Sequence, residues 1–485
     1  MLTLAHIMDA LIGVAPKWAS QVITEATVDS RQVIPGALFV AIKGEQRDGH
    51  DFVEEAFKKG AVLALVERDI QFKDLDPSLV PALDLRDPQA AAKQVTESGG
   101  PHLDTPICLY VEDSLAALQK TARYWRRKLD LRVIGITGSV GKSTTKELAA
   151  ELLSQRYYTL KNRGSLNNEI GLPLTLLSLS ENHQRAVLEM GFYVPGEIAF
   201  LCDLALPEIG LITNVSEVHA ERAGSLDAIA AGKAELVQAL PPAPQGVAIL
   251  NYDDPWVREM ASKTQAQVFY YGMDPAADLW ADEVVGMGLD GVRFRLHCGD
   301  DEFHLRVPLI GRHSVHTALR ATAVALVDGL SWEEIISGLR SGATQLRLVA
   351  VRSKNGALIL DDTYNASPQS TLAALNLLEE LDGRRIAVLG DMLELGPYKK
   401  SGHEMVGARA AEVVDELICM GELSKMIAGA ALQAGIPAAA VTQFDDTQQV
   451  VEYLADRLDE KDVVLVKGSR GLRMDRIVAA LEANR

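Results

Sequence analysis

The sequence has little cysteine, and its cysteines form none of the close pairs that mark metal or redox sites. No two of the four are separated by only two residues in this chain of 485. The C-x-x-C spacing of zinc ligands and thiol–disulfide motifs is therefore missing. Each cysteine lies in or beside an apolar stretch, which predicts four buried thiols in a reducing compartment. These are Cys108, Cys202, Cys298 and Cys419.

Long apolar runs are absent as well. No stretch of about 18 apolar residues occurs, so the sequence predicts no membrane-spanning helix. The first residues, Met1 to His6, lack the basic segment and the apolar core of a secretory signal peptide. We therefore expect a cytoplasmic protein.

Positive charge is in deficit across the chain. There are 48 Lys and Arg residues against 66 Asp and Glu residues, which gives a net charge of −18. This balance disfavours a nucleic acid or an anionic membrane as partner. An anionic substrate must instead be bound by local positive groups. Repeats of 20–50 residues and low-complexity tracts are also lacking, which argues against a repeat architecture.

The most informative stretch that is present is GITGSVGKSTT, residues 135–145. It follows an apolar pair and precedes a predicted helix at 147–155, and strand, glycine loop and helix form the context of a phosphate-binding loop. Lys142 would lie over the β- and γ-phosphates, and the Ser143 hydroxyl would bind Mg²⁺. Ile136 stands where the general G-x-x-x-x-G-K-[ST] pattern has glycine. The stretch predicts a site for a nucleoside triphosphate.

The order of apolar and helical segments predicts an α/β protein of three domains, since 485 residues exceed one ordinary core. We expect a small α/β domain at 1–105 and a central P-loop ATPase-like parallel sheet at 106–344. A C-terminal Rossmann-like domain is expected at 345–485. Apolar residues alternate with period two over 292–296 and 303–307, which predicts a small antiparallel addition to the central domain.

Polar residues follow several predicted strands, where open α/β sheets bind their ligands. Glu189 follows one such strand and His219 comes shortly after another. A solvated glutamate and a hydrogen-bonded loop histidine are the simplest interpretations of each residue alone. Together with Ser143 they form a plausible Mg²⁺ shell, because Mg²⁺ takes few protein oxygens besides phosphate. A nitrogen ligand would be unusual for Mg²⁺.

Two other positions allow more than one interpretation. Lys233 lies on a predicted helix at 226–240, and its spacing alone indicates a surface lysine. Ser30 and Arg31 precede a predicted strand. They are typical of a helix or turn cap with a surface arginine, but a loop of this composition could equally hold a phosphorylated ligand.

Taken together, these motifs resemble those of the Mur ligase family over essentially the whole chain. The matching stretches are 29–31, 35–36, 39–41, 48–50, 137–144, 167–173, 189–191, 213–215 with His219, 361–368, 389–396 and 467–470. Two of them, Tyr-Asn-Ala-x-Pro at 364–368 and Gly-Asp-Met-x-Glu-Leu-Gly at 390–396, resemble the family member that acts on a UDP-linked tripeptide.

The resemblance implies an ATP-dependent acid–D-amino-acid (peptide) ligase of peptidoglycan precursor synthesis, and so a role in cell wall biogenesis, cell shape and cell division. The carboxylate of UDP-MurNAc-tripeptide would attack the γ-phosphate of ATP to give an acyl phosphate. The amine of D-Ala-D-Ala would then displace the phosphate. Two alternatives stay open: a ligase adding the third amino acid to UDP-MurNAc-dipeptide, and a nucleotide-binding switch protein without ligation. A monomer is expected.

The resemblance also implies roles for individual residues. The implied catalytic residues are Lys142, Glu189, His219 and Lys233. The implied ligands of two Mg²⁺ ions are Ser143, Glu189, His219 and Lys233. Lys233 matches a lysine that relatives carbamylate with CO₂, which would turn an amine into an oxygen ligand. The implied ATP contacts are Gly138, Ser139, Gly141, Lys142, Ser143, Thr144, Asn251, Arg347 and Asp361. The implied contacts to the UDP-linked substrate are Ser30, Arg31, Asn167, Asn168 and Glu169.

Some positions depart from the family pattern. Relatives have asparagines where this chain has Ser314 and Thr317, which removes the support for a base contact there. Leu346 replaces a glycine before Arg347, and Ser367 replaces an asparagine. None of these residues belongs to the predicted phosphate-binding loop.

Overall fold

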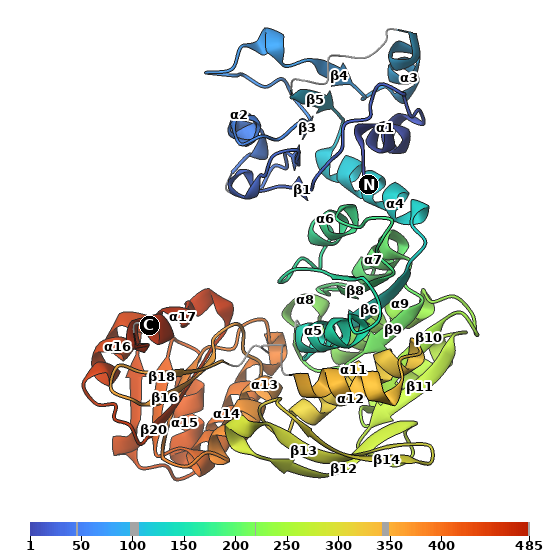
Figure 1. Ribbon diagram of the computed structural model, residues 1–485. Coiled ribbons are helices and arrows are strands. Elements are labelled where there is room, and N and C mark those ends of the chain that lie inside the picture. The colour runs from blue at the N-terminus through green and yellow to red at the C-terminus, as the bar shows by residue number, and fades with distance from the viewer. Residues whose placement is uncertain (45–46, 98–105, 219, 342–348, 484–485) are drawn as a thin grey trace. The chain divides into compact units, whose positions relative to one another are not determined.

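The computed structural model describes residues 1–485 except 45–46, 98–105, 219, 342–348 and 484–485 (Figure 1). The chain divides into two compact units. The first comprises 1–135, 157–191 and 197–208, and the second comprises 136–156, 192–196 and 209–485. The predicted domain boundaries at 105 and 344 stay a prediction. Among the described residues, none of the helices has the length and apolar character needed to cross a membrane.

The N-terminal part of the first unit contains a parallel sheet of five strands in the order β1-β2-β3-β5-β4. The strands are β1 (Ala26–Thr27), β2 (Leu38–Val40), β3 (Leu63–Val66), β4 (Ala82–Asp84) and β5 (Ile107–Tyr110). The helices are α1 (Leu4–Ile12), α2 (Val53–Lys58), α3 (Pro88–Glu97) and α4 (Ser114–Lys128). β2 and β3 are buried along their whole length, as expected for strands covered on both faces.

The rest of the first unit packs on α4. It contains β7 (Thr159–Lys161), α6 (Gly171–Leu177), β8 (Arg185–Glu189) and α7 (Glu197–Ala205), and β7 pairs with β8 in parallel. Trp125 of α4 is buried and donates its indole N–H to the Leu179 carbonyl at 3.0 Å. Beside it, the buried Arg126 donates to three backbone carbonyls, those of Leu129, Leu131 and Ala205. Both polar side chains are therefore satisfied inside the unit.

A nine-stranded sheet has the strand order β14-β13-β12-β11-β10-β9-β6-β8-β7. The strands not yet introduced are β6 (Arg132–Thr137), β9 (Ile209–Ile212), β10 (Val247–Asn251), β11 (Gln267–Gly272), β12 (Leu279–Gly286), β13 (Val292–Cys298) and β14 (Asp301–Val307). The helices of this part of the chain are α5 (Lys142–Leu153), α8 (Ala220–Ala223), α9 (Leu226–Gln238), α10 (Pro255–Arg258), α11 (Ser314–Val327) and α12 (Trp332–Ser341). β9, β10 and β11 run parallel, whereas β12, β13 and β14 pair antiparallel. The predicted antiparallel addition is confirmed.

The C-terminal part of the second unit contains a six-stranded sheet in the order β15-β16-β20-β17-β18-β19. Its strands are β15 (Val349–Arg352), β16 (Leu358–Asp362), β17 (Arg384–Gly390), β18 (Glu416–Met420), β19 (Val441–Phe444) and β20 (Asp462–Lys467). Its helices are α13 (Pro368–Glu379), α14 (Lys399–Val413), α15 (Lys425–Gln433), α16 (Thr447–Ala455) and α17 (Asp475–Leu481). All neighbours are parallel except β15, which pairs antiparallel with β16 at the edge. This is the predicted Rossmann-like arrangement.

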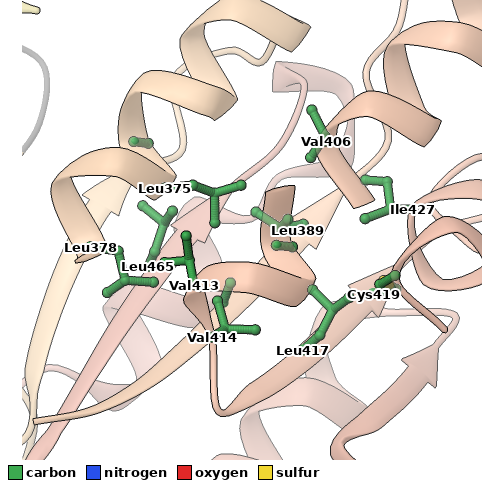
Figure 2. Packing of buried hydrophobic residues seen from close by; sticks show 14 of the residues in the cluster. Leu375, Leu378, Leu389, Val406, Val413, Val414, Leu417, Cys419, Ile427 and Leu465 are labelled. Atoms are coloured by element: carbon green, nitrogen blue, oxygen red, sulfur yellow. The ribbon is translucent and has the colours of Figure 1, made fainter. Parts of the chain in front are cut away.

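Two apolar layers cover the faces of this C-terminal sheet. On one face, side chains of α13, α14 and α15 pack on alternate residues of the strands, such as Leu389 and Leu465. Figure 2 shows Leu375, Val406 and Ile427 from these helices around Leu389. The opposite residues of the same strands pack against α16 and α17. The helices on both faces explain why the strands read as continuous apolar runs.

The structure corrects the prediction for one cysteine. Cys108, Cys202 and Cys419 are buried, as expected, but Cys298 is only half-buried. It is the last residue of β13, next to the turn to β14 at the end of the antiparallel addition. The strand end is covered there by fewer side chains than the sheet interior. The expectation of four buried thiols was wrong at this position.

Candidate active site

The glycine loop joins the end of β6 to the first residue of α5. Ile136 lies in the strand and is fully buried, so it belongs to the core and not to the loop. Gly138 has φ +144° and Gly141 has φ +86°, a region that residues with side chains rarely adopt. A Cβ atom on Gly138 would lie 1.8 Å from Thr213 Oγ1. Glycine is therefore required at 138 both by the backbone and by its neighbour.

The segment after β9 holds this loop in place. The Asn214 carbonyl accepts the Ser139 N–H at 2.9 Å, and Asn214 Oδ1 accepts the Val140 N–H at 2.8 Å. The Ser139 hydroxyl donates to the Ser216 carbonyl at 3.2 Å and accepts the Ser216 N–H at 2.9 Å. Ser139 and Asn214 therefore fix the loop to the segment after β9 through four hydrogen bonds. The sequence marked the cluster 213–215 as polar but gave no sign of this role.

Lys142 and the residues after it begin α5. The Lys142 ammonium donates to the carbonyls of Gly138 and Ser139, at 2.8 and 3.2 Å. It therefore lies folded over the loop, where a bound phosphate would meet it. The Thr144 hydroxyl donates to the Gly141 carbonyl at 3.0 Å. A helix N-terminus, a glycine loop and an ammonium group together make an anion site.

Two other predicted ATP contacts have protein partners of their own. Asn251, buried at the end of β10, donates to the Thr213 carbonyl at 2.9 Å and accepts the Asp253 N–H at 3.1 Å. Asp361, near the end of β16, accepts the N–H and the hydroxyl of Thr363 at 3.1 and 2.7 Å. Their contacts to ATP stay predictions. His219 and Arg347 lie outside the described residues.

Glu189 is buried at the end of β8 and held there by asparagines. Asn167 Nδ2 donates to Glu189 Oε1 at 2.9 Å. Asn162, which the sequence did not single out, accepts the Glu189 N–H and donates to the Glu189 carbonyl at 2.9 and 3.1 Å. The carboxylate is therefore oriented by a hydrogen bond, as metal-binding carboxylates are.

The other residues predicted to contact the UDP-linked substrate have varied environments. Asn168 Oδ1 accepts the N–H of Gly171, the first residue of α6, at 2.9 Å, while Glu169 is exposed. Ser30 is buried and donates to Glu55 at 3.2 Å. Arg31 is exposed and ion-paired with Asp29 at 2.7 Å, in a short 3₁₀ turn. The surface arginine that the sequence indicated is confirmed, but the cap of this turn is Asp29, whose carboxylate accepts the Arg31 N–H. Substrate contacts of Ser30 and Arg31 stay predictions.

Lys233 is the clearest difference from what its spacing indicated. It lies on α9 with an exposed fraction of 0%, so the interpretation as a surface lysine is wrong. Its Nζ lies 4.9 Å from the centroid of the Phe192 ring and has no hydrogen-bond partner in the described part of the chain. Burial, and then the charge of Lys142, lower the pKa of Lys233 well below its ordinary value. The protein environment therefore disfavours the charged form of this amine.

Phe192 explains how this burial arises. A Cβ on Gly232 would lie 2.0 Å from a ring carbon of Phe192, so the ring packs directly on the helix at the residue before Lys233. Phe192 itself is buried and follows the Glu189-Met190-Gly191 stretch in the chain. The small residue at 232 is the only sequence signal for this packing.

The glycine loop, the Lys142 ammonium and the N-terminus of α5 form an anion-binding site that is typical of nucleotide-using enzymes. Family comparisons agree with that class. Residues 22–103 match the Mur ligase family catalytic domain, 136–325 the Mur ligase middle domain, and 346–470 the Mur ligase glutamate ligase domain. The chain belongs to the Mur ligase family, whose curated relatives are named as ligases.

Similar proteins narrow this class. The chain is 33% identical to the UDP-N-acetylmuramoyl-tripeptide–D-alanyl-D-alanine ligase of Bacillus subtilis, over 96% of this chain and 94% of that protein. Its structure is similar to that of MurF from Acinetobacter baumannii, with a TM-score of 0.79, 30% identity and 98% of both chains covered. MurF ligase from Thermotoga maritima, solved in complex with ADP, gives a TM-score of 0.74 at 28% identity, over 94% of this chain and 96% of that one.

Proposed function

We propose that this protein joins D-Ala-D-Ala to UDP-MurNAc-tripeptide, with hydrolysis of ATP to ADP and phosphate. The observation that carries the proposal is the likeness, over nearly the full length of both chains, to relatives named for that reaction. In the reaction the tripeptide carboxylate attacks the γ-phosphorus and ADP leaves. The amine of D-Ala-D-Ala then attacks the acyl carbon, phosphate leaves, and the amine loses a proton.

The loop residues act on the first step. Both the carboxylate and the triphosphate are anions, so positive charge must offset their repulsion. Lys142 supplies that charge directly above the loop, where its ammonium now contacts the Gly138 and Ser139 carbonyls. When ATP binds, the ammonium exchanges these carbonyls for phosphate oxygens. Asn214 keeps the backbone of the loop in the same place throughout.

The residues present fit Mg²⁺. Glu189 offers an oriented carboxylate, Ser143 a hydroxyl at the start of α5, and Lys233 an orphaned buried nitrogen. Mg²⁺ takes few protein oxygens, because phosphate and water oxygens complete its shell. Bound Mg²⁺ would neutralise phosphate charge. His219, as a further ligand, belongs to the same proposal.

We also propose that Lys233 carries a carbamate. The neutral amine nitrogen attacks the carbon of CO₂, an N–C bond forms, and one proton is released. Burial and Lys142 both favour this reaction, because they lower the pKa of the amine and so favour its unprotonated form, and a protonated amine has no lone pair to attack CO₂. The product is an anion that would pair with Lys142 and offer oxygen to Mg²⁺. An apolar neighbour such as Phe192 admits uncharged CO₂ readily.

The remaining assignments extend this account to the whole chain. We propose three domains at 1–105, 106–344 and 345–485, the first binding the UDP end of the substrate through Ser30 and Arg31. Asp361 and Arg347 of the third would complete the ATP site. Because ATP and the UDP-linked substrate are cytoplasmic metabolites, the reaction would take place in the cytoplasm.

Phosphate release tests the proposed reaction. The protein is supplied with ATP, Mg²⁺ and UDP-MurNAc-tripeptide ending in either diaminopimelate or lysine, and D-Ala-D-Ala is added last. Release that starts only with the dipeptide supports the proposal. Release with UDP-MurNAc-dipeptide and a single amino acid would instead support the ligase that adds the third residue. Nucleotide binding without any acceptor-dependent release would support a switch protein.

A further inference from the structure

Arg320 of α11 is a buried cation beneath the glycine loop. Its exposed fraction is 7%, and its Nη1 lies 3.1 Å from Thr145 Oγ1 and 3.4 Å from the Gly141 carbonyl oxygen. A Cβ on Gly141 would lie 2.2 Å from that same nitrogen. The guanidinium therefore fills the space directly against the loop and the first turn of α5.

This guanidinium lacks an anionic partner. None of the described carboxylates pairs with Arg320, and its Nε has no hydrogen-bond partner among the described residues. Arg126 shows the contrast, because that buried guanidinium donates to three carbonyls. An isolated buried charge destabilises a folded protein unless something pairs with it.

The groups around Arg320 do not supply negative charge. Burial raises the pKa of the Tyr271 phenol, which donates its proton to the carbonyls of Ile212 and Thr213 and so stays neutral. One turn earlier on α11, burial and then the charge of Arg320 lower the pKa of His316 to about 4, so this imidazole is also neutral at pH 7. The positive charge of Arg320 is thus left uncompensated in the protein alone.

We propose that Arg320 is a positioning residue of the nucleotide site, whose charge is compensated by the phosphates bound in the loop. It fixes the Gly141 carbonyl and Thr145, and so sets the start of α5, where the N–H groups that bind phosphate begin. The guanidinium acts through the loop backbone and does not itself contact the nucleotide. The inference rests on the proposed function, which makes ATP the occupant of the loop.

The proposal predicts opposite effects on affinity and on stability. Arg320→Met keeps a long apolar side chain but removes the charge and both hydrogen bonds. The dissociation constant for ADP with Mg²⁺ should rise by about tenfold or more, measured by titration calorimetry. The thermal midpoint without nucleotide should stay equal or rise, because the unpaired buried charge is gone. Arg320→Lys, which keeps the charge, should bind ADP with intermediate affinity.

The matched control is Arg306→Met, which removes an exposed arginine of β14 that is paired with Asp290. Arg306→Met should leave the dissociation constant for ADP and the thermal midpoint unchanged, which excludes a general effect of losing one positive charge. The proposal is overturned if Arg320→Met binds ADP like the parent. It is also overturned if Arg320→Met lowers the thermal midpoint without nucleotide and Arg320→Lys restores both the midpoint and the affinity for ADP. Those results would describe a residue with a purely structural role. If the parent itself fails to bind ADP, the proposed function fails first.

Discussion

Replacing Lys233 with methionine should make the protein more stable and abolish most of its activity. Methionine matches the length of the lysine side chain without its amine. The amine is fully buried and lacks a hydrogen-bond partner among the described residues, so removing it relieves a desolvation penalty. Burying a polar group without a partner costs about 1–3 kcal/mol by mutational data. Above pH 10.5, where the lysine of the unfolded chain is neutral as well, the free energy of unfolding of Lys233→Met should therefore exceed that of the parent by about that amount.

The difference should depend on pH with a defined sign. Burial lowers the pKa of Lys233 below its ordinary value of 10.5, so between the two values the unfolded chain holds a proton that the folded chain lacks. The free energy of unfolding of the parent then rises with pH, by up to about 1.4 kcal/mol per unit for one proton. Lys233→Met has no such proton, so its free energy of unfolding lacks this pH dependence. The advantage of Lys233→Met should be larger at pH 7 than at pH 10 and shrink as the pH approaches 10.5.

Denaturant unfolding in CO₂-depleted buffer measures both quantities, because the amine is then not carbamylated. Turnover is measured separately with Lys233→Ala, which should lose most activity and regain part of it when a short carboxylic acid such as acetate fills the space. A Lys233→Met variant less stable than the parent would show that the amine makes stabilising contacts. A fully active Lys233→Arg would refute the carbamate, since a guanidinium does not form one at neutral pH.

Two further substitutions test the loop and the carboxylate. Glu189→Ala should lower kcat by about 100-fold or more, because an oriented carboxylate is lost from the proposed metal site, yet change the dissociation constant of UDP-MurNAc-tripeptide little. An equal loss of kcat and of affinity for UDP-MurNAc-tripeptide would contradict that role. The control is Glu181→Ala, which removes an exposed glutamate. Gly138→Ala should raise the KM for ATP by about 100-fold or more, because its Cβ would overlap Thr213 Oγ1 at 1.8 Å. Gly429→Ala, in a helix with no atom within 4 Å of the added Cβ, should keep the parent KM, and a parent-like KM in both variants would refute the steric argument.

The fold could be predicted well from the sequence because its signals are local. Apolar runs bounded by polar residues located strands such as β17 and β20, and period-two alternation located the antiparallel β13 and β14. The start of α5 was placed five residues too late, at 147 instead of Lys142. The polar Lys-Ser-Thr-Thr run does not read as a helix, and the left-handed Gly141 that begins it is visible only in the backbone.

The sequence predicted only those site residues that stand beside a recognisable motif or strand end. The glycine loop, Lys142 and Glu189 stand next to strand ends, so their position follows from sequence. The burial of Lys233 depends on Phe192, which is 41 residues away in the chain and comes to lie on Gly232 only through folding. Arg320 was missed for the same reason, since only tertiary packing places it against Gly141. Long-range packing between apolar neighbours leaves no periodic signal in a single sequence.

The mass of the reaction product tests the central claim most directly. The protein is incubated with ATP, Mg²⁺, D-Ala-D-Ala and UDP-MurNAc-tripeptide, and the UDP-linked species are analysed by mass spectrometry. The account predicts a species whose mass equals the two substrates minus one water, formed in step with one phosphate per molecule. Phosphate released from ATP while the UDP-linked tripeptide keeps its original mass would contradict it.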